Sequence, residues 1–357
     1  MRFSLSNDQS GQRVGRRLIR ARLGFASGLL LTLLLYLSGC ADTTSFINTP
    51  SMLDARGAAA DRILFLWWVM FGLGTVIFLG VMAYLLLAMF RSRREDESED
   101  SRKRHGKRAI VWGGLVLPTV VIVFLFALTV GVLAALEAPP VPDTHVIEVV
   151  GRQWWWEVNY PALQFTTANE IHIPVGEPVQ VKVTSEDVIH SFWVPQLNGK
   201  IDANPGRVNT IWLQADEPGT YFGQCAEFCG VQHAKMRFLV VAEEKNAYLA
   251  WVEQQQLPAP QPEDGPALEG QQVFLSSNCI NCHTIRGTNA TGNLGPDLTH
   301  LAGRLALGAG AIPNTRGNLG GWIADPHGVK PGNLMPPATE LSGAELTALL
   351  AYLETLR

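Results

Sequence analysis

Charged side chains are scarce in this sequence. Only 17% of its 357 residues are Asp, Glu, Lys or Arg, whereas soluble domains carry about 25%. The formal net charge is −4, so the chain lacks the basic surplus that a nucleic-acid binder needs for phosphate contacts. The 34 glycines and 21 prolines follow no repeat, which excludes collagen-like and low-complexity chains. The length favours two or three structural units.

Two stretches lack charge altogether. Residues 63–90 and 109–136 are each 28 residues without a single Asp, Glu, Lys or Arg. A helix of that length, at about 1.5 Å per residue, exceeds the roughly 30 Å hydrocarbon core of a membrane. We therefore expect two transmembrane helices, the second kinked at Pro118. Neither contains histidine, so the chain alone cannot hold a membrane-embedded haem through an imidazole.

The loop between these spans predicts their orientation. Residues 91–108 contain eight Lys or Arg and five Asp or Glu, and a short loop this rich in basic residues stays in the cytoplasm. Residues 40–62 and everything after Leu136 are therefore expected outside. The outer part, 137–357, has 12 basic and 23 acidic residues, a net charge of −11. That charge suits either plain solubility or attraction of cationic proteins.

Residues 1–39 have the composition of an export signal. A basic region precedes the apolar core Leu29–Leu37, which is too short to span a membrane stably. The sequence then reads Leu37-Ser38-Gly39-Cys40, which resembles the lipobox of bacterial lipoproteins and implies cleavage before an acylated Cys40. An ordinary signal peptide, or an uncleaved third span, is the alternative. The five cysteines are an odd number, which does not fit a simple disulfide framework.

The external part divides into two domains. Short runs rich in β-branched residues, bounded by Gly, Pro, Asn and Asp, predict a β sandwich or barrel for residues 137–256; they are 145–150, 178–184, 208–213 and 237–241. A helix at 245–255 closes it. Residues 257–266 contain four prolines and predict a semi-rigid linker. In residues 267–357, helices at 267–275 and 343–356 flank a Gly- and Pro-rich middle, so we expect a small helical domain built around a cofactor.

The first cluster of metal-binding side chains lies in the β domain. Cys225, Cys229, His233 and Met236 fall within twelve residues. Soft sulfur ligands with imidazole select copper or zinc, and a thioether favours copper. Two thiolates can bridge two copper ions, and His190 is a candidate for the second imidazole. A disulfide between the cysteines, or a Cys2His2 zinc site, is the alternative.

The second cluster is a haem-attachment motif. Cys279-Ile-Asn-Cys282-His283 is the pattern in which two thiols bind haem covalently and the histidine ligates its iron. Residues 294–299 and 333–337 are similar to segments of class I cytochromes c. Met335, 52 residues after His283, is the expected distal ligand, and His327 is its main rival. His300 is expected to face away from the iron.

The β domain resembles cytochrome oxidase subunit II and its dinuclear copper centre. Besides the cluster, the aromatic stretch 151–156, the segment 187–191 and the two preceding spans carry the resemblance, over roughly residues 60–245. It implies a cupredoxin-like Greek-key sandwich with Cys225 and Cys229 as bridging thiolates. It further implies one imidazole per copper, from His190 and His233, and two weak axial ligands, Met236 and the backbone carbonyl of Glu227. The Glu227 carboxylate would help to hold a magnesium ion at the contact with the catalytic subunit.

Trp154, Trp155 and Trp156 form the aromatic stretch. On a strand, the first and third would share a face, and we expect two of the three tryptophans to be core residues. The resemblance implies that Trp154 is a surface residue that receives electrons. The family commonly has a glutamate near the start of the second span, but residues 108–114 contain no carboxylate. A role for this chain in proton uptake is therefore doubtful.

The two clusters together resemble a caa-type oxidase, in which subunit II carries a fused cytochrome c domain. This implies an oxidoreductase and translocase subunit in the bacterial cell membrane, with its two domains on the periplasmic or extracellular side. Electrons would pass from haem c to copper and on to subunit I, which reduces oxygen to water with proton pumping. Implied partners are subunits I and III, membrane lipid, and cytochrome c or a bc complex as donor. A copper-containing nitric oxide reductase, a free-standing membrane electron shuttle and a copper-delivery protein are the alternatives.

Overall fold

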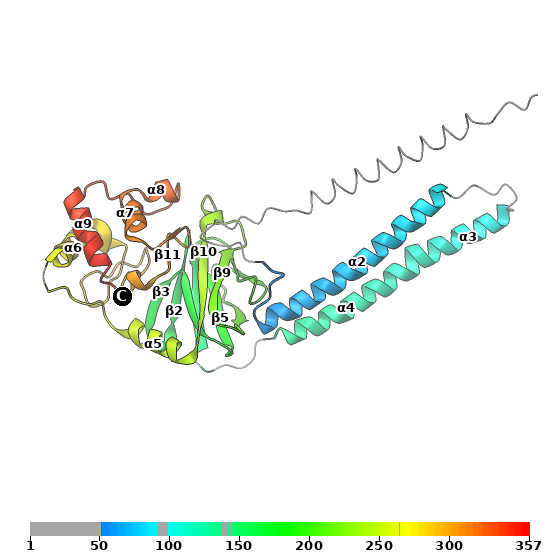
Figure 1. The fold of residues 1–357 in the computed structure, drawn as a ribbon, viewed down its shortest axis with the longest axis horizontal. Helices are drawn as coiled ribbons and strands as arrows, with labels where there is room; N and C mark the ends of the chain where they lie inside the picture. Colours follow the sequence, from blue (N-terminus) through cyan, green and yellow to red (C-terminus); the bar gives the residue numbers. More distant parts are fainter. Residues whose placement is uncertain (1–50, 91–98, 138–141, 143–144, 264) are drawn as a thin grey trace, which may run out of the picture. The chain divides into compact units, whose positions relative to one another are not determined.

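The computed structural model describes residues 51–90, 99–137, 142, 145–263 and 265–357 (Figure 1). The predicted leader and Cys40 lie outside these residues. The strands and the closing helix of the β domain lie between Val146 and Gln256, and the first helix of the C-terminal domain begins at Gly265.

Two long apolar helices precede the β domain. The first is α2 (Ala58–Phe90), and the second is a continuous run of α3 (Glu99–Val111), the π-helical turn η1 (Trp112–Val116) and α4 (Leu117–Ala135). Both are long and apolar enough to cross a membrane. Side chains along them, such as Val76 and Phe126, are exposed in the isolated chain. Unburied apolar helices of this length fit a lipid environment.

The second helix differs in two ways from the sequence prediction. Residues 99–108 were expected in a loop but form most of α3, because a run of Glu, Lys and Arg favours helix strongly and can extend the apolar helix that follows it. The irregularity expected at Pro118 occurs one turn earlier, as η1, in which Leu117 N donates to Trp112 O. A π turn of this kind re-pairs backbone groups close to a proline.

Residues 146–243 form two five-stranded sheets, which confirms the predicted sandwich. The first sheet has the order β3-β2-β1-β5-β8 and the second has the order β4-β10-β9-β6-β7. The strands of the first sheet are Val146–Arg152 (β1), Trp155–Tyr160 (β2), Phe165–Ala168 (β3), Val179–Ser185 (β5) and Asn209–Leu213 (β8). Those of the second are Glu170–Pro174 (β4), His190–Trp193 (β6), Lys200–Ala203 (β7), Gly219–Cys225 (β9) and Arg237–Glu243 (β10).

Side chains alternate between the core and the surface along these strands. In β5 every second residue is buried, from Val179 to Ser185, as expected for a strand with one face on a core. Phe192 and Phe238 stack at 4.5 Å inside the sandwich, and Trp156 meets both edge-on. Helix α5 (Lys245–Gln256) follows β10, close to the predicted bounds.

The C-terminal domain is mainly helical. Its helices are α6 (Gly265–Ser276), α7 (Arg316–Ala324), α8 (Pro326–Val329) and α9 (Gly343–Leu353), with short 3₁₀ turns at Asn278–Asn281 and Leu301–Gly303. It also contains a two-stranded ladder, β11 (Ala306–Leu307) with β12 (Ile312–Pro313). The all-α class I cytochrome c fold that the sequence predicts therefore carries one small addition, in which Gly308, Ala309 and Gly310 adopt positive φ and form a tight turn.

The proline-rich linker packs against the C-terminal domain instead of running free. Ala259 is only 3% exposed and belongs to that domain's apolar core. Its amide donates to Arg286 O at 2.9 Å, and the Arg286 guanidinium donates to Gln255 O. The linker thus forms part of the small domain's structure from Leu257 onward.

Candidate metal centres

The β sandwich brings six predicted ligand residues together from the start of β6 and from the chain between the end of β9 and the start of β10. His190 begins β6 and Cys225 ends β9, while the following loop carries Glu227 and Cys229. His233 lies in a 3₁₀ turn, and Met236 directly precedes β10. Cys225, Cys229 and Met236 belong to the buried core of the sandwich. The ligands therefore stand on one end of a rigid scaffold, which suits retention of a metal.

The sulfur and nitrogen atoms converge within a few ångströms. Cys225 Sγ lies 3.7 Å from Cys229 Sγ, and each sulfur faces one imidazole: His190 Nδ1 at 3.9 Å from the first and His233 Nδ1 at 3.7 Å from the second. Met236 Sδ lies 3.7 Å from Cys229 Sγ, and the Glu227 carbonyl lies 3.2 Å from Cys225 Sγ. The cysteines are free, and their separation far exceeds the roughly 2.05 Å of a disulfide. This donor set fits copper.

Asp187 orients His190. Its Oδ1 accepts from His190 Nε2 at 2.8 Å, which leaves Nδ1 facing Cys225. The same carboxylate accepts the amides of Gln153 and Val188 at 2.6 Å each. Gly151 leaves room for the ring, because a Cβ there would lie 2.7 Å from His190 Cδ2. A carboxylate that fixes the tautomer and direction of a ligating imidazole strengthens metal binding.

The two thiols differ in acidity. Contacts with Cys229, His190 and backbone groups lower the pKa of Cys225 to about 3, although burial opposes this. The neighbouring Cys225 and burial raise the pKa of Cys229. One thiolate therefore forms readily, while the second thiol releases its proton only when a cation compensates the added negative charge. This coupling suits a site that binds a cation.

Trp154 lies over the ligand loop. Its Nε1 donates to Cys229 O at 3.0 Å, and Gln153 Nε2 donates to the same carbonyl at 2.7 Å. A Cβ on Gly230 would lie 3.0 Å from the indole. Trp156 is fully buried and the partly exposed Trp154 packs against the same core, while Trp155 is partly exposed, so two of the three tryptophans contribute to core packing, as predicted. The peptide bond between Gln153 and Trp154 is cis.

The haem-attachment motif lies at the start of the C-terminal domain's loop region. Cys279 and Cys282 are free and partly exposed. His283 Nδ1 lies 2.8 Å from Pro296 O, which leaves Nε2 available. Burial lowers the pKa of His283, which keeps the imidazole neutral. A Cβ on Gly295 would lie 2.6 Å from His283 Cε1, so only glycine fits there. Two thiols beside an oriented, neutral imidazole fit covalent haem.

The three candidates for the distal position differ in their surroundings. Both ring nitrogens of His300 are engaged, with Arg357 O at 2.8 Å and Leu257 O at 3.2 Å, and the side chain is buried. His327 lies in α8. Met335 lies in the loop after α8, where its amide donates to Asn333 Oδ1 at 2.8 Å. The contacts of His300 agree with its predicted orientation away from the iron, and Met335 remains the proposed ligand.

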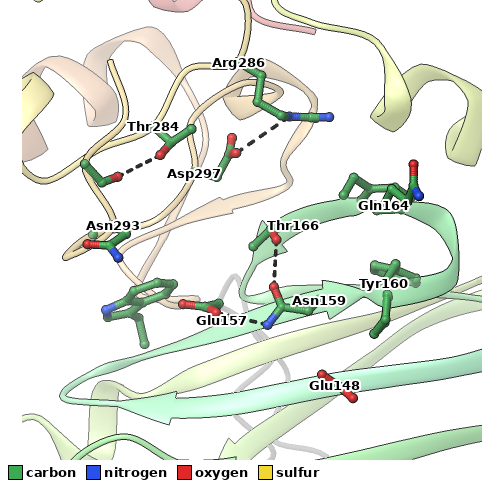
Figure 2. A pocket seen from close by; sticks show the side chains of 15 residues that line it. Glu148, Glu157, Asn159, Tyr160, Gln164, Thr166, Thr284, Arg286, Asn293 and Asp297 are labelled. Atoms are coloured by element: carbon green, nitrogen blue, oxygen red, sulfur yellow. Dashed lines mark hydrogen bonds and ion pairs between the residues drawn. The ribbon is translucent and has the colours of Figure 1, made fainter. Parts of the chain in front are cut away.

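A polar groove of about 520 Å³ lies between the sandwich and the C-terminal domain (Figure 2). On the sandwich side, Asn159 donates to Glu157 and accepts from Thr166. On the other side, Arg286 pairs with Asp297 at 3.7 Å. The described residues that line it include none of the predicted ligands, but Thr284 and Gly295 beside His283 are among them.

Sequence reasoning missed the residues that support the ligands. Asp187 lies within a segment that the sequence analysis quoted, but its role depends on the turn that folds it back to His190. Gly295 and Pro296 were noted only as part of the segment 294–299. Since these contacts depend on the tertiary fold, spacing along the chain gives little signal for them.

Family models match both the β domain and the C-terminal domain. Residues 162–243 match the model for the periplasmic domain of cytochrome c oxidase subunit II, and residues 267–357 match the model for cytochrome c. Among solved structures, the periplasmic domain of cytochrome oxidase subunit II from Bradyrhizobium japonicum is 35% identical. That match covers 33% of this chain and 96% of the other, with a TM-score of 0.32.

Relatives extend the match over most of the chain. The cytochrome c oxidase subunit 2 of Alkalihalophilus pseudofirmus is 36% identical over 333 residues, covering 91% of this chain and 95% of that protein. The subunit 2 of Bacillus sp. PS3 is 32% identical, covering 75% and 80%. A quinol oxidase subunit 2 from Bacillus cereus is 30% identical, covering 70% and 89%. The chain therefore belongs to the cytochrome c oxidase subunit 2 family, as an electron-accepting subunit of a haem-copper oxidase in which a copper-binding domain is fused to a cytochrome c domain.

Proposed function

We propose that the first centre holds two copper ions bridged by Cys225 and Cys229, and that Cys279 and Cys282 bind one haem covalently. When bound, such groups take up and release single electrons. We call the C-terminal domain the haem domain and the sandwich the copper domain. The chain would accept electrons at the haem domain and deliver them through the copper domain to catalytic subunit I. Oxygen would be reduced to water there, with proton pumping. The convergence of six donors, with each thiol facing one imidazole, is the observation that carries this proposal.

The protein groups have separate roles at the copper site. Asp187 fixes the direction of His190, while Met236 and the Glu227 carbonyl would serve as weak ligands. The Glu227 side chain is exposed and is free to hold a magnesium ion at the contact with subunit I. Trp154 is hydrogen-bonded to Cys229 O and would receive the electron that enters the copper domain.

Metal analysis and electron paramagnetic resonance of the full chain test the copper assignment. Two coppers per chain and a spectrum of one electron shared by both ions are expected. A single copper with a four-line spectrum, or zinc in its place, would contradict the assignment.

Met335→Leu tests the distal haem ligand. Haem should stay attached through Cys279 and Cys282, the weak near-infrared sulfur-to-iron band should vanish, and the potential should fall, since a thioether ligand raises it. His327→Ala is the matched control. If His327→Ala loses the native spectrum and Met335→Leu keeps the band, the distal ligand is His327.

Purification of the complex distinguishes the functional alternatives. An oxygen-consuming complex with a many-span, histidine-rich partner supports the oxidase, and a nitric-oxide-reducing complex supports the reductase. A chain found alone supports a shuttle or a delivery protein. The full ligand set and the fused haem domain favour oxidation of a cytochrome over oxidation of quinol, despite the quinol oxidase relative. Subunit III, and cytochrome c or a bc complex as donor, are proposed further partners.

We also propose that α2 and the α3–α4 helix cross the bacterial cell membrane with both domains outside. The eight Lys and Arg residues within 91–108, which join the two uncharged stretches, support this orientation. Lipidation of Cys40 remains a prediction, tested by mass spectrometry of the N-terminal peptide. An unmodified Cys40, or residues preceding it in the mature protein, would contradict it. Cys40→Ser should leave membrane attachment intact, because lipid adds little beside a transmembrane helix.

A further inference from the structure

A continuous series of hydrogen bonds joins the proposed haem-ligand loop to the copper-ligand loop. Met335 N donates to Asn333 Oδ1 at 2.8 Å, and Asn333 Nδ2 donates to Lys330 O at 2.8 Å. Lys330 Nζ then crosses to the copper domain and donates to Trp154 O at 2.8 Å. Trp154 Nε1 donates to Cys229 O at 3.0 Å. Four hydrogen bonds thus separate the backbone of one proposed ligand from that of another.

Lys330 is unusual because it is a buried lysine. Only 3% of its surface is exposed, although most lysines lie in solvent. Burial, assisted by nearby Lys235, lowers the pKa of Lys330 to about 7. The amine keeps N–H donors in both protonation states, so its bond to Trp154 O does not depend on the charge. A buried amine is costly unless it is hydrogen-bonded, and Trp154 O is the partner that satisfies it.

Neighbouring residues make contacts at the same place. Gln232, beside the copper ligand His233, donates to Pro331 O, and Lys235 donates to Val329 O. A Cβ on Gly332 would lie 3.2 Å from the Val231 side chain, so the two loops approach closely. The segment 329–332 is therefore seated on the copper-ligand loop by several contacts, and Lys330 is its buried anchor.

We propose that Lys330 and Asn333 are positioning residues that hold the Met335 loop of the haem domain against Trp154, so that the two redox centres keep one fixed separation. Asn333 ties the Met335 amide to Lys330, and Lys330 ties that loop to the copper domain. This bridge of hydrogen bonds through Lys330 and Asn333 would keep the haem domain in place as the electron donor at Trp154. It would also restrict access of other donors to that surface. This inference rests on the proposed function, since it takes Met335 and Cys229 as ligands.

Hydrogen–deuterium exchange of the full chain tests the bridge without requiring activity. Lys330→Met keeps the length and apolar stem of the side chain but removes the donor. Loss of one such bond should lower the ratio of docked to undocked haem domain by about tenfold, equal to about 1.4 kcal/mol. Peptides spanning 228–234 and 329–334 should then exchange about tenfold faster. Lys245→Met is the control, because Lys245 is exposed and pairs with Glu177.

Asn333 variants give an independent test that spares the lysine. Asn333→Asp keeps the acceptor for the Met335 amide but removes the donor to Lys330 O, whereas Asn333→Leu removes both. Exchange of the 329–334 peptide should rise in the order wild type, Asp, Leu. Circular dichroism checks that each variant is folded, and these variants decide the question if Lys330→Met does not fold.

The rate of electron transfer between the domains is the functional readout. In a chain loaded with haem and copper, Lys330→Met should slow this single-turnover step by about the same factor as the ratio of docked to undocked haem domain falls. The haem and copper spectra should stay unchanged. Unchanged exchange and an unchanged transfer rate in both Lys330→Met and Asn333→Leu would overturn the inference. Failure of the proposed function would instead appear as missing metal or haem in the wild type, and the exchange test would still stand.

Discussion

Asp187 shows how one residue outside the ligand set can control a metal centre. Replacing it with Asn removes the charge that holds His190 through Nε2 and should weaken copper binding about 10- to 100-fold. Copper titration of the metal-free chain measures this. Glu186→Gln is the control, since Glu186 is exposed and contacts Arg152 at 3.8 Å. Equal copper affinity in Asp187→Asn and wild type would show that His190 is fixed by packing alone.

At the haem centre, Gly295 is a residue outside the ligand set that controls the position of a ligand, His283. Ala at this position would place its Cβ 2.6 Å from the His283 ring, so the imidazole must shift. We expect a loss of about 1–3 kcal/mol in the free energy of unfolding, as for other overpacked sites, together with an altered haem spectrum. Gly303→Ala serves as the control, because a Cβ there meets open space. Thermal unfolding monitored by haem absorbance compares the two variants.

Single-residue chemistry was largely predictable, whereas the supporting contacts were not. Cys225, Cys229 and His233 could be identified because one loop carries them in sequence, and His190 because the resemblance indicated where a second imidazole belongs. Asp187, Gly295 and Lys330 act through contacts across the fold. Their residue types are common on surfaces and in turns, so nothing in the local sequence distinguishes them.

At the scale of elements, the close crossing of α6 and α9 organises the haem domain. A Cβ on Gly270 would lie 1.9 Å from Ala348 O, so Gly270→Ala should push the helices apart and cost about 3 kcal/mol or more. Gly317→Ala, in α7 with open space around it, should instead be neutral or slightly stabilising, because alanine favours helix. Denaturant unfolding of both variants measures the difference. Equal stability would mean that the crossing adapts easily.

Elements with a clear pattern were predictable and those without one were not. Strand β5 alternates strictly, and the sequence prediction differs from the observed strand by one residue at each end. Helix α3 was expected as loop because charge was taken as a sign of a connecting segment, although Glu, Lys and Arg also favour helix. The β11–β12 ladder has strands of only two residues, too short for any periodicity to be visible.

At the scale of the whole molecule, Glu170 makes domain docking sensitive to pH. It is only 4% exposed, and its Oε1 accepts the amides of Leu305 and Ala306 from the haem domain at 2.7 and 3.2 Å. Burial raises its pKa from 4.5, although His172 and Arg304 favour the charged form. The docked chain therefore holds a proton that the undocked chain releases, so docking should weaken as pH rises from 4.5 through the raised pKa.

Glu170→Gln should remove this part of the pH dependence. Gln keeps an oxygen acceptor for both amides but cannot ionise. Amide exchange at Leu305 and Ala306, measured at about pH 5 and about pH 8 and corrected for intrinsic exchange, gives the docking equilibrium in each chain. Wild type should be less protected at the higher pH, and the variant should change less. An identical pH response in both chains would assign the effect to groups other than Glu170.

The short connection between the domains has a kinetic consequence. Helix α5 ends at Gln256, and Ala259 is already buried in the haem domain's core, so almost no free chain separates donor from acceptor. A short tether gives the attached partner a millimolar effective concentration. Reduction of the copper domain by its own haem domain should therefore proceed at a rate that does not change when the protein is diluted. A soluble cytochrome would have to reach comparable concentrations to compete at that surface.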